Sequence, residues 1–315
     1  MLSVIIPAFN EHENISNTTR VITDILDGAS IDFELVYVDD GSRDTTWQEI
    51  CSCNQRDGRI RGVRFSRNFG KEGAIFAGLR AVTGDCAVLL DCDLQHPPEL
   101  IPKMYSMWES GAEVVEAVKA SRGKESLLYK LFAKSFYRIM KNSSGIDLDG
   151  ASDFKLLDRK AIDALNEMPE RMTFFRALSS WVGFRSEKIE FDVKPRAAGK
   201  TKWSFIKLSR FALNSITSFT SIPLHLITAV GVLFAVLALV LGVQTLVNYF
   251  CGNAAEGFST VILLILILGA CVMIGIGVMG FYLSKIYEEI KQRPRYIVSE
   301  RVGIGSVSGK DDRHE

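Results

Sequence analysis

The chain has 315 residues, and its 37 Lys and Arg balance its 37 Asp and Glu, so it carries no net charge. An apolar content of 47% excludes a disordered chain, which would bury too little apolar surface to offset its ordering entropy. The charge balance also excludes a protein that binds nucleic acid through a strongly basic surface.

Short apolar runs alternate with helical patterns along the first 120 residues. This rhythm predicts an α/β fold with a mostly parallel sheet and helices on both faces. The expected strands are Leu2–Pro7, Phe33–Val38, Ile60–Phe65, Ala87–Leu90 and Val114–Val118. The expected helices run from Glu11 to about Leu26, from Asp44 to Cys53 and from Lys71 to Val82, with a further helix starting at Pro97.

Acidic side chains follow three of these strands. Glu11 comes after the first strand, Asp39 and Asp40 end the second, and Asp91 and Asp93 end the fourth. In an open parallel sheet, ligands bind beyond the carboxyl ends of the strands. The sequence therefore predicts a site for a cation and a polar ligand at this edge.

The glycine-rich loops that usually bind phosphate are missing from the sequence. It has no G-x-x-x-x-G-K-[ST] loop, and no G-x-G-x-x-G follows the first strand. Asp91-x-Asp93 offers hard oxygen ligands that suit Mg²⁺ or Mn²⁺, which can neutralise a diphosphate. If this segment is extended, Gln95 lies on the same side as Asp93, two residues earlier. The alternative interpretation of the D-x-D motif is a solvated loop.

The apolar residues are concentrated near the C-terminus. No Asp, Glu, Lys or Arg occurs in 211–255 or in 257–284. Each stretch is long enough to cross a membrane, which takes about 20 residues, so we expect a transmembrane hairpin at about 224–248 and 258–283. Basic residues flank the pair and are absent from the turn, which predicts that both termini are cytoplasmic. A buried core helix, the alternative, is usually shorter and amphipathic.

Two segments predict contact with the membrane surface. Residues 203–222 mix aromatic and basic side chains, as an interfacial helix does. Between Arg122 and Lys141, basic residues that include Lys130 and Lys134 alternate with apolar ones, which favours an anionic surface or a lipid phosphate. A solvated helix face is the alternative for each.

Five motifs occur in order: SVIIPAFNE, VDDGSRDTT, DCDLQHPPE, GASDFKLLDR and RAAGKTKWS. Together they resemble those of family 2 glycosyltransferases with a GT-A fold, and most of all the polyprenyl-phosphate glycosyltransferases, which include bactoprenol glucosyltransferases and dolichol-phosphate mannose synthases. The resemblance implies a GT-A domain at 1–202, an interfacial segment at 203–222, a transmembrane hairpin at 223–284 and a cytoplasmic tail at 285–315.

The resemblance also implies roles for individual residues on the donor side. The residues implied to bind the donor are Pro7, Phe9, Glu11, Asp39, Asp40, Asp91, Cys92 and Asp93. Asp39 is expected at the base, and Asp91 and Asp93 at the ribose and diphosphate. The metal, Mg²⁺ or Mn²⁺, would be held by Asp93, Gln95 and Asp91.

On the reaction and acceptor side, Arg196 and Lys202 match a basic pair that contacts the leaving diphosphate. Asp153 matches a carboxylate near the reacting sugar, and its alternative role is to cap a turn. The expected catalytic residues are thus Asp93, Asp153, Arg196 and Lys202. Arg122 falls on the acceptor loop, and it is grouped for acceptor binding with Lys130 and Lys134.

The implied reaction is inverting transfer of a hexose from a nucleotide sugar, with UDP-glucose favoured, to the phosphate of a polyprenyl lipid such as undecaprenyl phosphate. Mannose and N-acetylhexosamine remain as alternative sugars. A polysaccharide synthase is disfavoured because the sequence has no Q-x-x-R-W motif, and a transporter because no charged residue lies within either span. A binding module without activity would have lost the D-x-D motif. The expected setting is the inner membrane, as a homo-oligomer such as a tetramer, without nucleic acid.

Overall fold

The computed structural model describes residues 1–119, 152–168, 174–191, 222–251 and 258–304. The chain divides into two compact units. We call the first the sheet unit; its described residues are those up to 191 together with 293–304. The second is the hairpin unit, with described residues 222–251 and 258–292.

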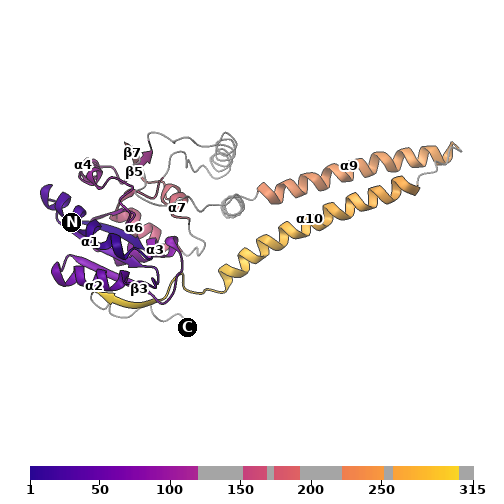
Figure 1. Cartoon of the computed structure of the whole chain (residues 1–315). Coiled ribbons are helices and arrows are strands. Elements are labelled where there is room, and N and C mark those ends of the chain that lie inside the picture. Colours follow the sequence, from indigo (N-terminus) through magenta and orange to yellow (C-terminus); the bar gives the residue numbers. More distant parts are fainter. Residues whose placement is uncertain (120–151, 169–173, 192–221, 252–257, 305–315) are drawn as a thin grey trace. The chain divides into compact units, whose positions relative to one another are not determined.

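One mixed sheet forms the centre of the sheet unit (Figure 1). Its eight strands lie in the order β7-β5-β6-β4-β1-β2-β3-β8. The pairs β4–β1, β1–β2, β2–β3 and β5–β7 are parallel, and the other three pairs are antiparallel. The strands are β1 (Leu2–Ala8), β2 (Phe33–Asp39), β3 (Ile60–Phe65), β4 (Cys86–Leu89), β5 (Val114–Lys119), β6 (Lys155–Asp158), β7 (Ser186–Phe191) and β8 (Val298–Val302).

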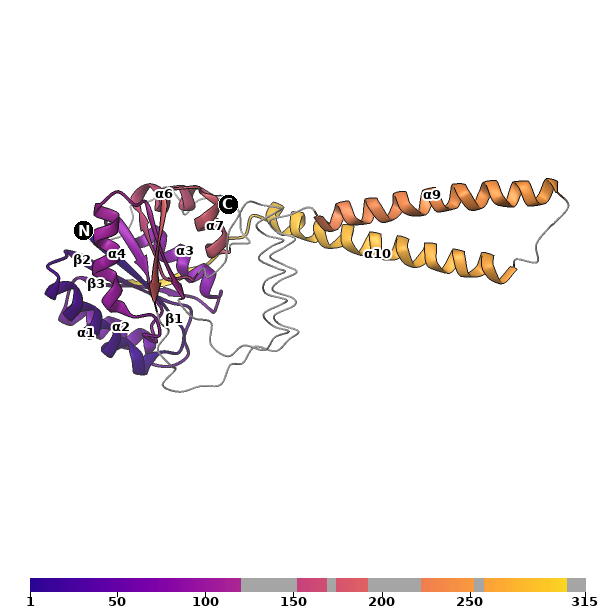
Figure 2. The same ribbon diagram turned by 90° about the horizontal axis from the view of Figure 1, so that it is seen from above.

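Helices cover both faces of this sheet, as the alternating pattern predicted. The helices are α1 (His12–Gly28), α2 (Thr46–Arg56), α3 (Lys71–Ala81), α4 (Ile101–Glu109), α6 (Arg159–Glu167) and α7 (Phe175–Trp181), with a 3-10 turn, η1 (Pro98–Leu100), before α4. Figure 2 shows α1 and α2 on one side of the sheet and α6 on the other. The expected mostly parallel α/β fold is therefore confirmed.

The central strands are buried on both faces because each face is covered by helices. In β1, Leu2, Val4 and Ile6 belong to the core that includes α1. Ile5 points to the opposite face, where α3 approaches so closely that a Cβ at Gly78 would lie 2.3 Å from the Ile5 side chain. Strands buried on both sides have continuous apolar runs, and β1 and β2 were recognisable in the sequence for that reason.

The edge strand β8 was not anticipated from the sequence. Residues 285–315 were expected to form one cytoplasmic tail, but 285–290 continue helix α10 and 298–302 pair antiparallel with β3. Figure 1 shows this strand, in yellow, beside β3. Tyr296 stacks on Phe65 with ring centroids 4.9 Å apart, which anchors the segment just before β8. The sheet is thus completed by residues that follow the hairpin in the chain.

The hairpin unit consists of two long apolar helices, α9 (Ile222–Phe250) and α10 (Phe258–Ile290). Within them, Ile227–Gln244 has a mean hydropathy of 2.4 and Ile267–Ile290 one of 2.0, so both are long and apolar enough to cross a membrane. None of the first stretch and only 6% of the second is buried. The core helix of a soluble protein would be mostly buried, so these exposed apolar surfaces fit a lipid environment instead.

Candidate active site

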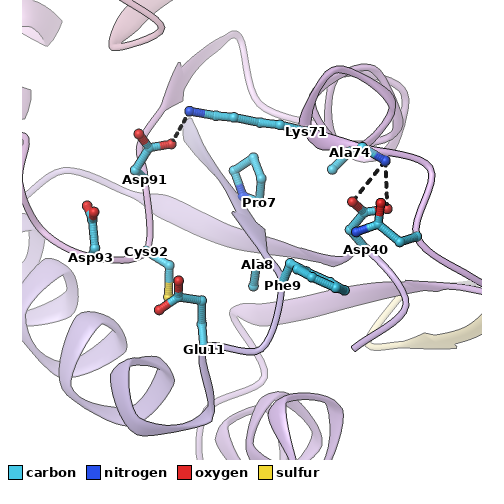
Figure 3. Close-up of a pocket in the computed structure, with 12 residues that line it drawn as sticks. Pro7, Ala8, Phe9, Glu11, Asp40, Lys71, Ala74, Asp91, Cys92 and Asp93 are labelled. Carbon is cyan, nitrogen blue, oxygen red and sulfur yellow. Dashed lines mark hydrogen bonds and ion pairs between the residues drawn. The ribbon is translucent and has the colours of Figure 1, made fainter. Parts of the chain in front are cut away.

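A cavity of about 310 Å³ opens at the carboxyl ends of β1, β2 and β4 (Figure 3). Its walls come from the loops that follow these strands and from the start of α3. The residues that line it are Pro7, Ala8, Phe9, Glu11, Asp40, Asn68, Gly70, Lys71, Ala74, Asp91, Cys92 and Asp93. Seven of the eight residues predicted to bind the donor are in this set, and Asp39 is the exception. Their meeting follows from the parallel order of the strands.

The loop after β1 is held in place by the turn after β2 and by the first residue of α2. Asn10 has a φ of 55°, and its backbone N–H donates to Ser42 Oγ at 2.9 Å. The backbone N–H of Glu11 donates to Thr46 Oγ1, also at 2.9 Å. Phe9 remains 43% exposed on the cavity wall. An exposed aromatic ring in a polar cavity offers a surface on which a flat ring can stack.

The adjacent carboxylates Asp39 and Asp40 do different things. Both oxygens of Asp40 accept hydrogen bonds from the backbone at the start of α3, including Phe69 N at 2.7 Å. Asp39 is fully buried and does not line the cavity; its Oδ1 accepts from Ser42 N at 2.9 Å. Burial raises the pKa of Asp39, and its hydrogen bonds with Ser42 and the charge of Arg64 offset this only in part.

Gly41 lets this turn pass close to the next loop. It has a φ of 68°, and a Cβ there would lie 2.4 Å from the backbone carbon of Arg67. Only glycine fits this combination of left-handed backbone and close approach. The D-D-G-S motif is therefore a packing requirement as well as a source of carboxylates.

The loop after β4 presents the D-x-D motif. Asp91 and Asp93 lie together on one side of the cavity in Figure 3. Cys92 between them is buried, and its carbonyl accepts a hydrogen bond from Thr18 of α1 at 2.7 Å. Gln95, predicted as a metal ligand, does not line the cavity; its backbone N–H donates to Asp93 Oδ1 at 3.1 Å. Cys92 thus fixes the loop to α1, and the carboxylates of Asp91 and Asp93 on either side of it line the cavity.

A chain of four alternating charges crosses the site. Lys71 Nζ lies 2.5 Å from Asp91 Oδ1 and 2.9 Å from Asp153 Oδ2, as its reach toward Asp91 in Figure 3 illustrates. Arg176 then holds Asp153 with two parallel hydrogen bonds, of 2.6 Å from Nε and 2.9 Å from Nη2. The structure therefore connects Asp153, predicted to lie near the reacting sugar, to the D-x-D motif through a lysine that the sequence analysis did not single out.

The charge chain determines the ionisation of its members. Burial alone would raise the pKa of Asp153, but Arg176 and Lys71 together hold it well below the usual range. Burial would likewise lower the pKa of Lys71, yet Asp91 and Asp153 keep it above its ordinary value. Asp153 is thus an anion, and Lys71 a cation, at any physiological pH.

Two further acidic groups, the half-buried Glu72 and the buried Glu116, support this arrangement. Glu72 accepts a hydrogen bond from the first backbone N–H of α7, Phe175 N, at 2.8 Å, and its burial raises its pKa to about 7. Lys155, which is fully buried two residues after Asp153, pairs with Glu116 and donates to Ser179 Oγ at 2.9 Å. These contacts tie α3, α7, β5 and β6 together around the charge chain.

The residues present suit a divalent cation that is shared with a ligand. Among the described residues, no group of three or more His, Cys, Asp or Glu side chains is arranged to hold a metal ion. Mg²⁺ is commonly held by one or two carboxylates together with substrate phosphates. Asp91 and Asp93, both facing the cavity, meet that requirement, so this donor set fits a Mg²⁺ or Mn²⁺ ion that binds with a diphosphate.

Several predicted site residues lie outside the described residues. These are the acceptor candidates Arg122, Lys130 and Lys134 and the diphosphate-binding candidates Arg196 and Lys202. The interfacial segment is outside as well, apart from residue 222, which begins α9. The roles predicted for them stay predictions.

The acidic cavity with its exposed aromatic ring lies at the carboxyl ends of parallel strands, where α/β sheets commonly bind ligands. Comparison with known proteins gives the class: residues 3–165 match the family described as glycosyl transferase family 2. This chain belongs to that family and is a glycosyltransferase, as its motifs predicted.

Relatives match nearly the whole chain, including the hairpin. A Prophage bactoprenol glucosyl transferase homolog of Escherichia coli is 36% identical over 299 residues, covering 94% of this chain and 98% of the relative. A Bactoprenol glucosyl transferase of Shigella phage SfX is 34% identical over 302 residues, covering 95% and 99%. A glycosyltransferase of Synechocystis is 37% identical over 305 residues, covering 96% of each.

A crystal structure of glucosyl-3-phosphoglycerate synthase from Mycobacterium tuberculosis with Mn²⁺ and UDP-glucose is similar at a TM-score of 0.45. The identity is 20%, covering 69% of this chain and 76% of that chain.

Proposed function

We propose that this chain transfers a hexose, with glucose favoured, from a nucleotide diphosphate sugar to the phosphate of a membrane polyprenyl lipid such as undecaprenyl phosphate. The observation that carries the proposal is one cavity where an exposed ring, Phe9, and the carboxylates Asp91 and Asp93 face the same space, in a chain that also has two helices able to span a membrane. The similarity to bactoprenol glucosyl transferases along the whole chain supports the choice of sugar and acceptor.

In the proposed complex, the nucleoside stacks on Phe9 and the ribose and diphosphate extend toward Asp91 and Asp93. A divalent cation held by these two carboxylates would neutralise the diphosphate as it leaves. Asp39 Oδ2 is buried and accepts no hydrogen bond from the described residues, and we assign to this unsatisfied acceptor an N–H group of the base. Lys71 also faces the cavity, and its ammonium group suits a phosphate oxygen.

The acceptor needs no strong general base. The second pKa of a phosphate monoester is about 6, so the attacking oxygen is already ionised at neutral pH. Asp153 would be a poor base in any case, because Arg176 and Lys71 hold its pKa low. We therefore assign Asp153 an electrostatic and orienting role near the sugar, where positive charge develops in the transition state. Catalysis then consists of positioning the phosphate behind the anomeric carbon, which inverts the configuration.

The proposed topology places both ends of the hairpin on the cytoplasmic side of the inner membrane. It is supported by β8, which follows the hairpin in the chain and pairs with β3, which precedes it. Two membrane crossings between β3 and β8 return the chain to the side on which it started. The basic flanks of the hairpin favour the cytoplasm for that side. A homo-oligomer in the membrane remains a prediction of the family resemblance.

The test is to incubate the purified protein with Mg²⁺ or Mn²⁺, undecaprenyl phosphate and a panel of radiolabelled nucleotide sugars. We expect label from UDP-glucose in the lipid, and loss of that label in Asp93→Asn. Replacing the lipid phosphate by the free polyprenol should stop the reaction, because the ionised nucleophile is lost. Labelling of the lipid from GDP-mannose or a UDP-N-acetylhexosamine instead would show that the transferred sugar is not glucose. If no sugar labels the lipid, the proposal is wrong.

A further inference from the structure

A row of three charges runs across the edge of the sheet next to the nucleoside end of the cavity. Asp39 on β2 is in register with Arg64 on β3, and Arg64 is in register with Glu300 on β8. Opposed residues on neighbouring strands interact directly through their side chains. The outermost member of the row comes from the strand that follows the hairpin, 236 positions after Arg64.

Arg64 is shared between the two carboxylates, but unequally. Its Nη1 donates to Glu300 Oε1 at 2.6 Å, whereas its Nε lies 3.4 Å from Asp39 Oδ2. The other oxygen of Glu300, Oε2, accepts a hydrogen bond from the indole N–H of Trp47 at 2.8 Å. The Glu300 carboxylate is therefore fixed at both oxygens, and it draws the guanidinium group away from Asp39.

We propose that Glu300 is a positioning residue of the donor site: it acts through Arg64 to keep the buried Asp39 Oδ2 without a hydrogen bond from the protein, so that the nucleoside can supply one. The inference rests on the nucleoside-binding role proposed above for Asp39.

The physical reason is competition for one guanidinium group. Asp39 is fully buried and needs a positive charge nearby, since an unpaired buried carboxylate is strongly unfavourable. A full hydrogen bond from Arg64 to Oδ2 would satisfy that need but would occupy the acceptor atom that a base N–H requires. Because Arg64 makes its shorter contact with Glu300, its positive charge lies near Asp39 but it donates no hydrogen bond to Oδ2.

The test replaces Glu300 by Gln, which preserves an oxygen for the Trp47 N–H but removes the charge that attracts Arg64. We expect Arg64 to move onto Asp39, so that the Kd of UDP measured by calorimetry and the KM of UDP-glucose rise about 3- to 10-fold, with kcat within about twofold of the parent. Thermal unfolding serves as the readout of a purely structural effect.

A matched control exists elsewhere in the sheet unit. Arg59 pairs with Asp27 at the same 2.6 Å, and the Asp27 side chain is 50% exposed, against 49% for Glu300. Asp27→Asn therefore removes an equivalent surface ion pair far from the cavity lining. It should shift the unfolding temperature as much as Glu300→Gln does and leave the Kd of UDP unchanged.

A double-mutant cycle decides whether the effect passes through Arg64. In an Arg64→Gln background, Glu300→Gln should have no further effect on the Kd of UDP, because no guanidinium group remains to be redirected. An undiminished effect in that background would refute the relay. If Asp39→Asn weakens UDP binding and Glu300→Gln does not, the inference is wrong while the role of Asp39 stands. If Asp39→Asn leaves UDP binding unchanged, the role of Asp39 fails and the inference with it.

Discussion

Replacing Lys71 by methionine tests whether its ammonium group and a divalent cation compete for Asp91. In the structure Nζ lies 2.5 Å from Asp91 Oδ1 and 2.9 Å from Asp153 Oδ2, so it occupies Asp91, one of the two carboxylates proposed to hold the cation. Lys71→Met keeps the length of the side chain and removes its charge. We expect Mn²⁺ to bind more tightly to this variant in the absence of nucleotide.

The expected gain in Mn²⁺ affinity can be calculated from Coulomb's law. Two unit charges about 4 Å apart interact by ~4 kcal/mol at an effective dielectric constant of ~20. The Lys71 side chain is 42% exposed, so solvent screens the interaction, and about 1–2 kcal/mol is a reasonable value after that discount. This corresponds to a decrease of about 5- to 30-fold in the Kd of Mn²⁺.

The assay is titration of free Mn²⁺ by electron paramagnetic resonance. Lys71→Arg should bind Mn²⁺ as weakly as the parent, because the competing charge remains. Lys103→Met, at an exposed position on α4 outside the cavity lining, controls for the loss of one positive charge from the sheet unit. Unchanged or weaker Mn²⁺ binding in Lys71→Met would refute the competition. In the same variant, the KM of the nucleotide sugar should rise, because a phosphate partner is lost.

Three further predictions concern the surroundings of the charge chain. Arg176→Ala should lower kcat by about 10- to 100-fold through misplacement of Asp153, with partial recovery in Arg176→Lys, as separate kcat and KM values will show. Burial raises the pKa of Glu72 from 4.5 to about 7, so the folded state favours its protonated form, and the stability that this gives is lost as the pH rises from 4.5 toward 7. Glu72→Gln should therefore weaken the dependence of the unfolding temperature on pH across that range. A pH dependence equal to that of the parent would contradict this. Glu116→Gln removes the only carboxylate paired with the fully buried Lys155 among the described residues and should cost about 3–5 kcal/mol in denaturant unfolding, whereas replacing both residues by apolar ones should cost far less.

The sequence was most informative where one physical constraint acts over a short stretch. Strands β1 and β2, which are buried along almost their whole length, contain continuous apolar runs. The strands expected from Leu2, Phe33 and Ile60 begin at those residues in the structure. The carboxylates at their ends were predicted to meet because parallel strands end at one edge, and most of them line one cavity.

The residues that were missed act through contacts between distant parts of the chain. In the sequence, Lys71 and Arg176 resemble ordinary charged residues near the starts of helices. Only the fold brings them to Asp153, which is 82 positions from Lys71. Glu300 lies in a five-residue strand after the hairpin, where a short polar run gives no distinct pattern. Both Asp39 and Asp40 were expected to bind the donor, but only Asp40 lines the cavity, because the turn after β2 directs the two buried carboxylates to different hydrogen-bond partners.

The place of β8 in the chain has a consequence for biosynthesis. This strand is translated after both apolar helices, so the sheet stays one strand short until the ribosome has passed them. During that interval β3 is an open edge, and its unpaired N–H and C=O groups are a template for pairing with another polypeptide. In the proposed topology, insertion of the two helices into a bilayer would therefore precede completion of the sheet. A truncated chain that ends before the hairpin would keep the unpaired edge of β3 permanently.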